Sequence, residues 1–212
     1  MRTFLTLTLL GALAACGNAS TGPSVAQQLI GLLRAGQQPD GPRVDGAALR
    51  AGITPEIVAQ TGGGVLIVDI PARGAVAALG RVGVNGDVMT FLTPDGISIS
   101  TKRGMIVATR GLGNDLMIAD VAEPLATLAG QRQQAVRIHE FLDGENQTVS
   151  RSFMCTYARA ASNQIIESCR ADDLAFENTY TLAADGRIAQ AKQWISPEIG
   201  YVITAEFLSP PT

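Results

Sequence analysis

The sequence predicts a mainly β protein with a few short helices. Its 212 residues include 23 glycines and 10 prolines but only 5% aromatic residues, which is typical of short strands joined by many turns. Hairpin dipeptides recur between segments with apolar or β-branched residues, at Asn85-Gly86, Asp95-Gly96, Asp143-Gly144 and Asp185-Gly186. The 46% of hydrophobic residues can fill the core of one domain. A helical bundle is hard to reconcile with these turns.

The N-terminal segment predicts export and lipid attachment. Arg2 precedes an uncharged run from Phe4 to Ala15, which is too short to span a bilayer, since spanning needs about 20 apolar residues. The run matches a secretory signal peptide. Leu13-Ala14-Ala15-Cys16 resembles the bacterial lipobox, so we expect residues 1–15 to be removed and Cys16 to carry acyl chains such as palmitate. The alternative is an ordinary signal peptide followed by an incidental cysteine.

The residues after Cys16 bear on its destination. Gly17 stands where an inner-membrane retention signal would place Asp, so the resemblance to other lipoproteins implies the outer membrane, with the protein facing the periplasm. Each methylene of the acyl chains contributes about 0.8 kcal/mol to anchoring. Residues 16–23 form the lipidated N-terminus and a small, polar tether. No repeat is evident, and we expect a single β-rich domain over residues 24–212.

Three short helices are expected. Ser24 can cap a helix over 24–35, and residues 37–46 form a loop by composition. A second helix is expected near 55–60, where Thr54-Pro55-Glu56 supplies an N-cap, an N1 proline and a first-turn acid. A third is expected near 124–130. Strands begin with the apolar run Val65–Ile70.

The last hairpin turn predicts a register. A two-residue turn at Asp185-Gly186 sets Leu182 opposite Ala189, Tyr180 opposite Ala191 and Phe176 opposite Ile195. These apolar residues then share one face of the sheet. Turn position and hydrophobic pattern therefore agree.

The two remaining cysteines predict a disulfide. With Cys16 used by lipid, Cys155 and Cys169 form an even pair in an oxidising compartment, without the C-x-x-C spacing of a redox motif. Setting them opposite one another places Arg151 opposite Asp173 and gives an antiparallel hairpin. Closing a loop of about 15 residues stabilises a fold by roughly 3 kcal/mol in the chain-entropy model.

Charge and histidine content exclude several function classes. The pI of about 5.2 and net charge of -3 give no basic surplus for nucleic acid, and none is expected as a partner. His139 is the single histidine, so no histidine-rich metal site is expected. In a strand it faces away from its neighbour Glu140, and a structural role is favoured over a catalytic one.

Two short motifs mimic ligand sites without matching them. Gly111-Leu112-Gly113 resembles the start of a dinucleotide fingerprint, but Leu116 replaces the third glycine, and we expect no cofactor. Asp143, Glu145 and Asn146 lack the spacing of a calcium loop, and a hairpin turn explains them better. We therefore expect no metal site.

The segment from Gly104 to Met117 (GMIVATRGLGNDLM), with Val88-Met89-Thr90-Phe91 upstream, resembles the YjbF family of lipoproteins, which includes the GfcB capsule lipoproteins. The resemblance covers essentially the whole mature chain, although Phe91 stands where the family favours tryptophan. It implies a large antiparallel meander sheet curled into a partial barrel, encoded among capsule or exopolysaccharide production and secretion proteins. It supplies no catalytic residue, and we expect no enzyme activity.

The function favoured on this basis is an accessory or assembly factor in polysaccharide secretion, with other export proteins as partners. Arg110, Asn114 and Asp115 are expected to present polar groups to a partner or to an internal network. The alternative is a lipid- or glycan-binding lipoprotein that uses the concave face of the sheet. Trp194 and Tyr201 could line a sugar groove, although core packing explains them better. A hydrolase with an unrecognised carboxylate pair is a third hypothesis.

Overall fold

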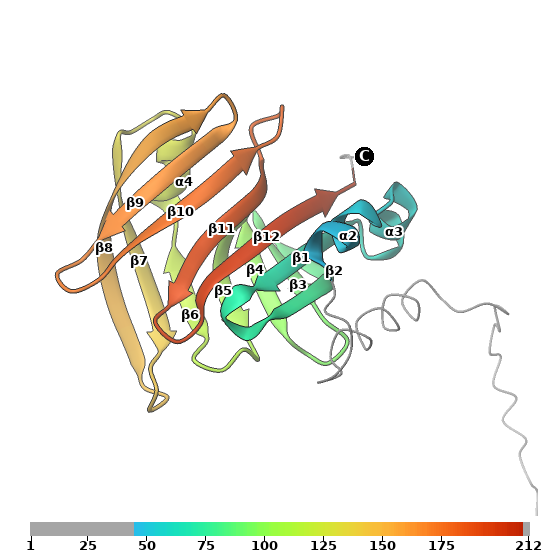
Figure 1. Cartoon of the computed structure of the whole chain (residues 1–212), viewed down its shortest axis with the longest axis horizontal. Coiled ribbons are helices and arrows are strands. Elements are labelled where there is room, and N and C mark those ends of the chain that lie inside the picture. The colour runs from blue at the N-terminus through green and yellow to red at the C-terminus, as the bar shows by residue number, and fades with distance from the viewer. Residues whose placement is uncertain (1–44, 210–212) are drawn as a thin grey trace, which may run out of the picture.

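The computed structural model describes residues 45–209, and within them twelve strands form one antiparallel sheet (Figure 1). The predicted mainly β class is therefore confirmed. The helix predicted over 24–35 and the lipidation site Cys16 lie outside the described residues. The strands are β1 (Gly64–Ile70), β2 (Ala75–Asn85), β3 (Val88–Leu92), β4 (Ser98–Lys102), β5 (Met105–Arg110), β6 (Leu116–Asp120), β7 (Gln134–Leu142), β8 (Thr148–Ala161), β9 (Gln164–Arg170), β10 (Ala175–Leu182), β11 (Ile188–Ser196) and β12 (Gly200–Leu208).

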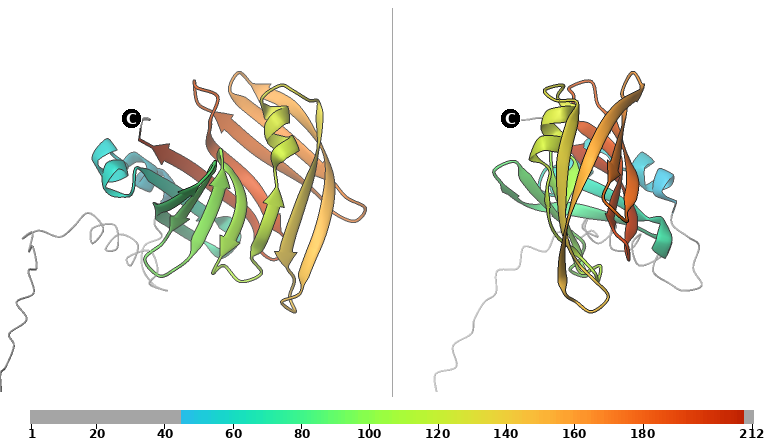
Figure 2. Two further views of the ribbon diagram at one scale, coloured as in Figure 1. Left: turned by 180° about the vertical axis from the view of Figure 1, so that it is seen from behind. Right: turned by 90° about the vertical axis from the view of Figure 1, so that its left-hand side faces the viewer.

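The sheet is a meander that closes back on itself. Its order is β5-β4-β3-β2-β1-β12-β11-β10-β9-β8-β7-β6, so that β5 and β6, consecutive in the chain, are the two edge strands. Figure 2, seen from behind, shows β6 beside β5 in the same wall, in front of β11 and β12. Curling a twisted sheet brings its edges together and hides their unpaired backbone groups. The expected partial barrel is confirmed.

The helices are short, and each packs against the sheet. They are α2 (Gly46–Ala51), α3 (Pro55–Gln60), the 3₁₀ turn η1 (Pro71–Arg73) and α4 (Ala122–Leu128). The Thr54 hydroxyl caps α3 by accepting from the Ile57 N–H at 3.4 Å, as the sequence predicts. The third predicted helix is present, two residues earlier than expected. None of the helices in the described part of the chain has the length and apolar character needed to cross a membrane.

Helix α2 was not predicted, and its first residue, Gly46, lies in the stretch 37–46 that was expected to be a loop. The Asp45 side chain caps it by accepting from the Ala47 N–H at 2.9 Å. Leu49 of α2 and Val58 of α3 pack on the outward side chains of β1, Val65 and Ile67. Strand β1 is thus covered on both faces, which explains why it reads as a continuous apolar run.

The predicted turns lie in hairpins, but three of them have three-residue loops. In these, the amide of Thr93, Asp143 or Ala183 donates to the carbonyl four residues later. The last loop residue has positive φ: Gly96, Asn146 and Gly186. This is a type I turn followed by a left-handed bulge, whose twist matches the flanking strands.

The predicted β10–β11 register is therefore only partly right. Tyr180 pairs with Ala191 as expected. Leu182 pairs with Ile188 and not with Ala189, because the loop has three residues instead of the two that were assumed. The pairing of Phe176 with Ile195 is wrong, since the ladder ends at Thr179. Beyond it the two strands separate, and the Asn178 carboxamide oxygen accepts from the Trp194 N–H at 2.7 Å.

Strand β5 also meets β11 across the interior. The Gln193 carboxamide accepts from the Ile106 N–H at 3.0 Å and donates to the Gly104 carbonyl at 3.2 Å. Gly104 has φ +87°, and a Cβ there would lie 2.6 Å from Cβ of Ile188. Only glycine fits this conformation and this close approach. One half of the curled sheet is thereby drawn onto the other half.

Candidate functional site

The segment Gly104–Met117 includes β5 and the start of β6, the two edge strands. These strands have no backbone ladder to each other, and the line along which they meet is called the seam below. Asp115, 8% exposed, accepts from the Thr109 hydroxyl at 2.7 Å and from the backbone N–H groups of Gly111 (2.9 Å) and Leu112 (3.2 Å). The Thr109 hydroxyl in turn accepts from the Leu116 N–H at 3.0 Å. Side chains thus replace the missing ladder at this point.

Arg110 covers the same seam from the outside. Its guanidinium donates to the carbonyls of Thr109 (2.5 Å), Leu116 (3.0 Å) and Met117 (3.2 Å). The three carbonyls belong to both edge strands. Arg110 therefore joins β5 to β6 and satisfies acceptors that strand pairing would otherwise use.

Asn114 ties the seam to neighbouring loops. It adopts φ +50°, and its carboxamide donates to the Asp143 carbonyl in the β7–β8 hairpin at 2.5 Å. Arg73 of η1 donates to the Leu112 carbonyl at 2.5 Å. The hydrogen bonds of Arg110, Asn114 and Asp115 are thus those of an internal network, one of the two roles that the sequence left open. A contact between these residues and a partner stays a prediction.

A second polar cluster lies inside the barrel and was missed by sequence reasoning. Arg137 of β7 and Glu167 of β9, 1% and 0% exposed, form an ion pair with Nη1 to Oε2 at 3.1 Å. Burial alone lowers the pKa of Arg137, but the Glu167 carboxylate together with Tyr180 and Tyr157 outweighs burial and holds that pKa above its ordinary value. Burial alone raises the pKa of Glu167, but the Arg137 charge together with the hydrogen bonds from Tyr157, Tyr180 and Asn178 outweighs burial and lowers that pKa. Both groups are therefore charged.

The remaining oxygen lone pairs of Glu167 are also used. It accepts from Tyr157 (2.5 Å), Tyr180 (2.7 Å) and the Asn178 carboxamide (2.6 Å). Burial, followed by the Glu167 charge, raises the pKa of Tyr157, and burial raises that of Tyr180 well above its usual range. Both tyrosines are therefore neutral donors. The only sequence signal for this cluster was the alternation of inward and outward side chains along a strand. It places Arg137 and Glu167 on inward positions but does not show that the two residues meet.

His139 extends the cluster into a group of aromatic rings. Its Nε2 accepts from Arg137 Nε at 2.8 Å, and its ring stacks on Trp194 with centroids 5.7 Å apart. Burial, and then the Arg137 charge, lowers the pKa of His139 well below its usual value. The structural role predicted for His139 agrees with this neutral, buried imidazole. Trp194 likewise belongs to the inner core, whereas Tyr201 lies under the Lys192 ammonium at 4.3 Å.

The cysteine pair forms the predicted cross-strand disulfide. Cys155 of β8 and Cys169 of β9 are directly opposite in the register and are bonded. Arg151 and Asp173 approach to 3.4 Å at the same hairpin, as expected. Glu167 lies beside the two sulfurs, within 4.8 Å, but the disulfide occupies both thiols, and Glu167 is engaged by Arg137.

The concave face of the sheet is filled by side chains. One apolar cluster draws buried residues from all twelve strands, including Phe91, Met105, Leu116, Phe153 and Val202. Each of these five is at most 1% exposed. The alternative function, a ligand held on the concave face, therefore finds packed core over most of that face, apart from the α4 end, where Tyr157 and Ile165 line a pocket.

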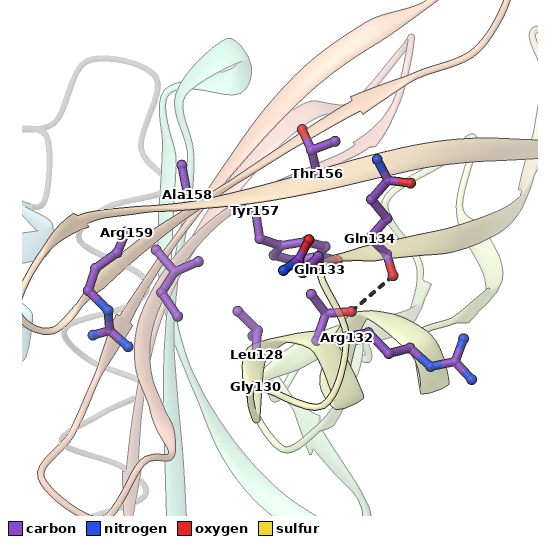
Figure 3. A pocket seen from close by; sticks show the side chains of 11 residues that line it. Leu128, Gly130, Arg132, Gln133, Gln134, Thr156, Tyr157, Ala158 and Arg159 are labelled. Carbon is purple, nitrogen blue, oxygen red and sulfur yellow. Dashed lines mark hydrogen bonds between the residues drawn. The ribbon is translucent and has the colours of Figure 1, made fainter.

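Pockets on the described part of the chain include two at the edge of this core. One, of about 500 Å³, lies between α4, β7 and β8, and Arg132, Tyr157 and Arg159 are among its lining residues (Figure 3). The other, of about 480 Å³, lies where β10 and β11 separate and includes Glu177, Lys192 and Tyr201. The first is lined by no carboxylate and the second by one, so neither offers the carboxylate pair that a glycoside hydrolase needs.

Comparisons with known proteins agree with this architecture. A family model described as group 4 capsule polysaccharide lipoprotein GfcB, YjbF, matches residues 46–208. The fold is similar to the crystal structure of the hypothetical lipoprotein YmcC from Escherichia coli K12. That similarity has a TM-score of 0.62 at 14% identity and covers 79% of this chain and 94% of that one. No curated protein matches the chain.

The family match begins with α2 and ends with β12, so that it includes every helix and strand described here. It therefore includes the seam segment, the buried ion pair and the disulfide. The chain belongs to the YjbF family of capsule polysaccharide lipoproteins.

Proposed function

We propose that the protein is an outer-membrane lipoprotein that faces the periplasm and acts, without catalysis, as an accessory or assembly factor in capsule or exopolysaccharide production and secretion. The observation that carries this proposal is the family match over residues 46–208. The lipobox-like Leu13–Cys16 segment supports the anchor, with Cys16 as the acylated residue. Other polysaccharide-export proteins are the proposed partners.

Features of the described domain support a role through contacts rather than turnover. Its buried ion pair is fully hydrogen-bonded within the core, and its seam residues bond to backbone groups of the same chain. The end of β2 exposes Val82 and Val84, at 61% and 58%. Exposed apolar residues of this kind favour contact with another protein.

The test is secreted polysaccharide from a strain that lacks the protein, complemented with wild type or with Cys16→Ala. We expect loss of polymer in the deletion strain and recovery only with the wild type. Separation of inner and outer membranes by density, followed by immunoblotting, should place the wild type in the outer fraction. Equal polymer in all strains would contradict the proposed role.

A further inference from the structure

The pocket between α4, β7 and β8 carries positive charge on an acidic protein. Arg132 and Arg159 line it from opposite sides of the view in Figure 3, and no acidic residue lines it. Arg132 pairs with Glu123 of α4 at 3.0 Å, and Arg159 donates to the Ser162 carbonyl at 2.6 Å. Each guanidinium has five N–H donors, so both keep donors for a ligand. An anionic group is therefore favoured in this pocket over a cation.

The walls between the arginines are apolar and amide-bearing. Leu128, Ile165 and the half-buried Tyr157 supply an aliphatic and aromatic surface, while Gln133 and Gln134 supply carboxamides. C–H faces of a sugar ring pack on such a surface, and its hydroxyls pair with carboxamides. The volume of about 500 Å³ lies within the range of small-molecule sites, roughly 300–1,000 Å³.

Tyr157 holds its place from behind. Its hydroxyl donates to Glu167 at 2.5 Å, and the Arg137 guanidinium fixes that carboxylate in turn. The ring cannot rotate away without leaving the buried carboxylate short of a donor. The pocket wall is thus fixed before any ligand arrives, which lowers the entropic cost of binding.

We propose that this pocket binds an acidic segment of a polysaccharide, with carboxylates of different sugar units on Arg132 and Arg159 and a sugar ring against Tyr157. The inference rests on the proposed function, because secretion supplies the polymer. A lone phosphate can pair with one arginine but leaves the other arginine, the aromatic wall and the carboxamides unused. A neutral sugar uses the wall but leaves two guanidinium groups without an anion.

The test is calorimetric titration of the full chain, purified in detergent, with a tetramer of galacturonate. Maltotetraose and inorganic phosphate serve as the neutral-sugar and anion-only probes. We expect saturable binding of the tetra-uronate, and at least tenfold weaker binding by Arg132→Gln/Arg159→Gln, because each substitution removes a charge-assisted hydrogen bond. Maltotetraose and phosphate should each bind at least tenfold more weakly than the tetra-uronate.

Arg151→Gln/Arg187→Gln is the matched control. Arg151 and Arg187 are also exposed and paired with aspartates, and their loss changes the net charge equally, but they lie outside the pocket. This control should bind like the wild type. Equal losses in the two double variants, or phosphate binding as tight as that of the tetra-uronate, would overturn the proposal. Thermal unfolding checks that both variants fold, as expected from the small contribution of exposed ion pairs.

The export assay separates this inference from the proposed function. If the deletion strain secretes normal polymer while the purified protein binds tetra-uronate through the arginines, the secretion role fails and the site stands. If Arg132→Gln/Arg159→Gln restores secretion fully and the wild type does not bind tetra-uronate, the site fails and the secretion role stands.

Discussion

The Asp115 carboxylate accepts a hydrogen bond of 2.7 Å from the Thr109 hydroxyl, across the turn that joins the two edge strands of the sheet. The same hydroxyl accepts from the amide of Leu116, the first residue of β6. Edge strands expose unpaired backbone groups that favour aggregation. In this protein, side chains of the segment Thr109–Asp115 hydrogen-bond several of these groups and so connect the two edges of the barrel.

Asp115→Ala should therefore destabilise the fold by about 2–3 kcal/mol, because buried donors lose their acceptor. Urea unfolding of the full chain measures the change in free energy of unfolding. Asp172→Ala is the control, since Asp172 is exposed and should change stability by less than about 0.5 kcal/mol. A loss at Asp115 no larger than at Asp172 would show that the seam does not depend on this carboxylate.

Glu167→Gln should cost about 3–5 kcal/mol, because it leaves the buried Arg137 cation without its counter-charge. Adding Arg137→Met to this variant removes the unpaired charge, so the double variant should be more stable than Glu167→Gln alone. Chemical unfolding of the wild type, of Glu167→Gln and Arg137→Met singly, and of the double variant completes a double-mutant cycle. Additive losses would argue against coupling between the two residues.

Loss of the Cys155–Cys169 disulfide should lower stability by about 3 kcal/mol, as the chain-entropy model gives for a loop of about 15 residues. Cys155→Ala/Cys169→Ala can be compared with the wild type with and without dithiothreitol. Reductant should destabilise the wild type toward the variant and leave the variant unchanged. An equally large effect of reductant on the variant would locate the sensitivity elsewhere.

Glu206 should make stability depend on pH. Burial raises its pKa, although the Thr101 hydroxyl, which donates at 3.0 Å, and the charges of Arg187 and Arg81 oppose the shift. A carboxyl with a raised pKa stabilises the fold below the unfolded-state pKa and loses that contribution as pH rises through the folded-state pKa.

Glu206→Gln should accordingly melt at a higher temperature than the wild type at pH 7–8, with the difference shrinking toward pH 4. The measurement is thermal unfolding as a function of pH. Glu145→Gln, at an exposed hairpin residue, is the control and should show no such trend. A constant difference between Glu206→Gln and the wild type across this range would exclude titration of Glu206 as its cause.

Local patterns in the sequence were sufficient for the β class, the positions of the turns and the disulfide. Asp or Asn before Gly marks a chain reversal, because few other residues adopt the backbone angles of a tight hairpin turn. Cys155 and Cys169 can be set opposite one another without knowledge of any other strand. Loop length is less well determined. The extra loop residue before Gly186 changes the cross-strand partner of Leu182 to Ile188. The Asp-Gly dipeptide alone does not reveal this extra residue.

Only the tertiary structure decided which distant residues meet. The sequence places Arg137 and Glu167 on inward faces of strands, and alternation says nothing about the closure that brings them within 3.1 Å. Likewise Gly104, Gln193 and Ile188 come together only when β5 folds over β11. The physical reason is that hydrogen-bonded neighbours in a meander follow from chain order, whereas contacts across a barrel depend on the twist and curl of the whole sheet.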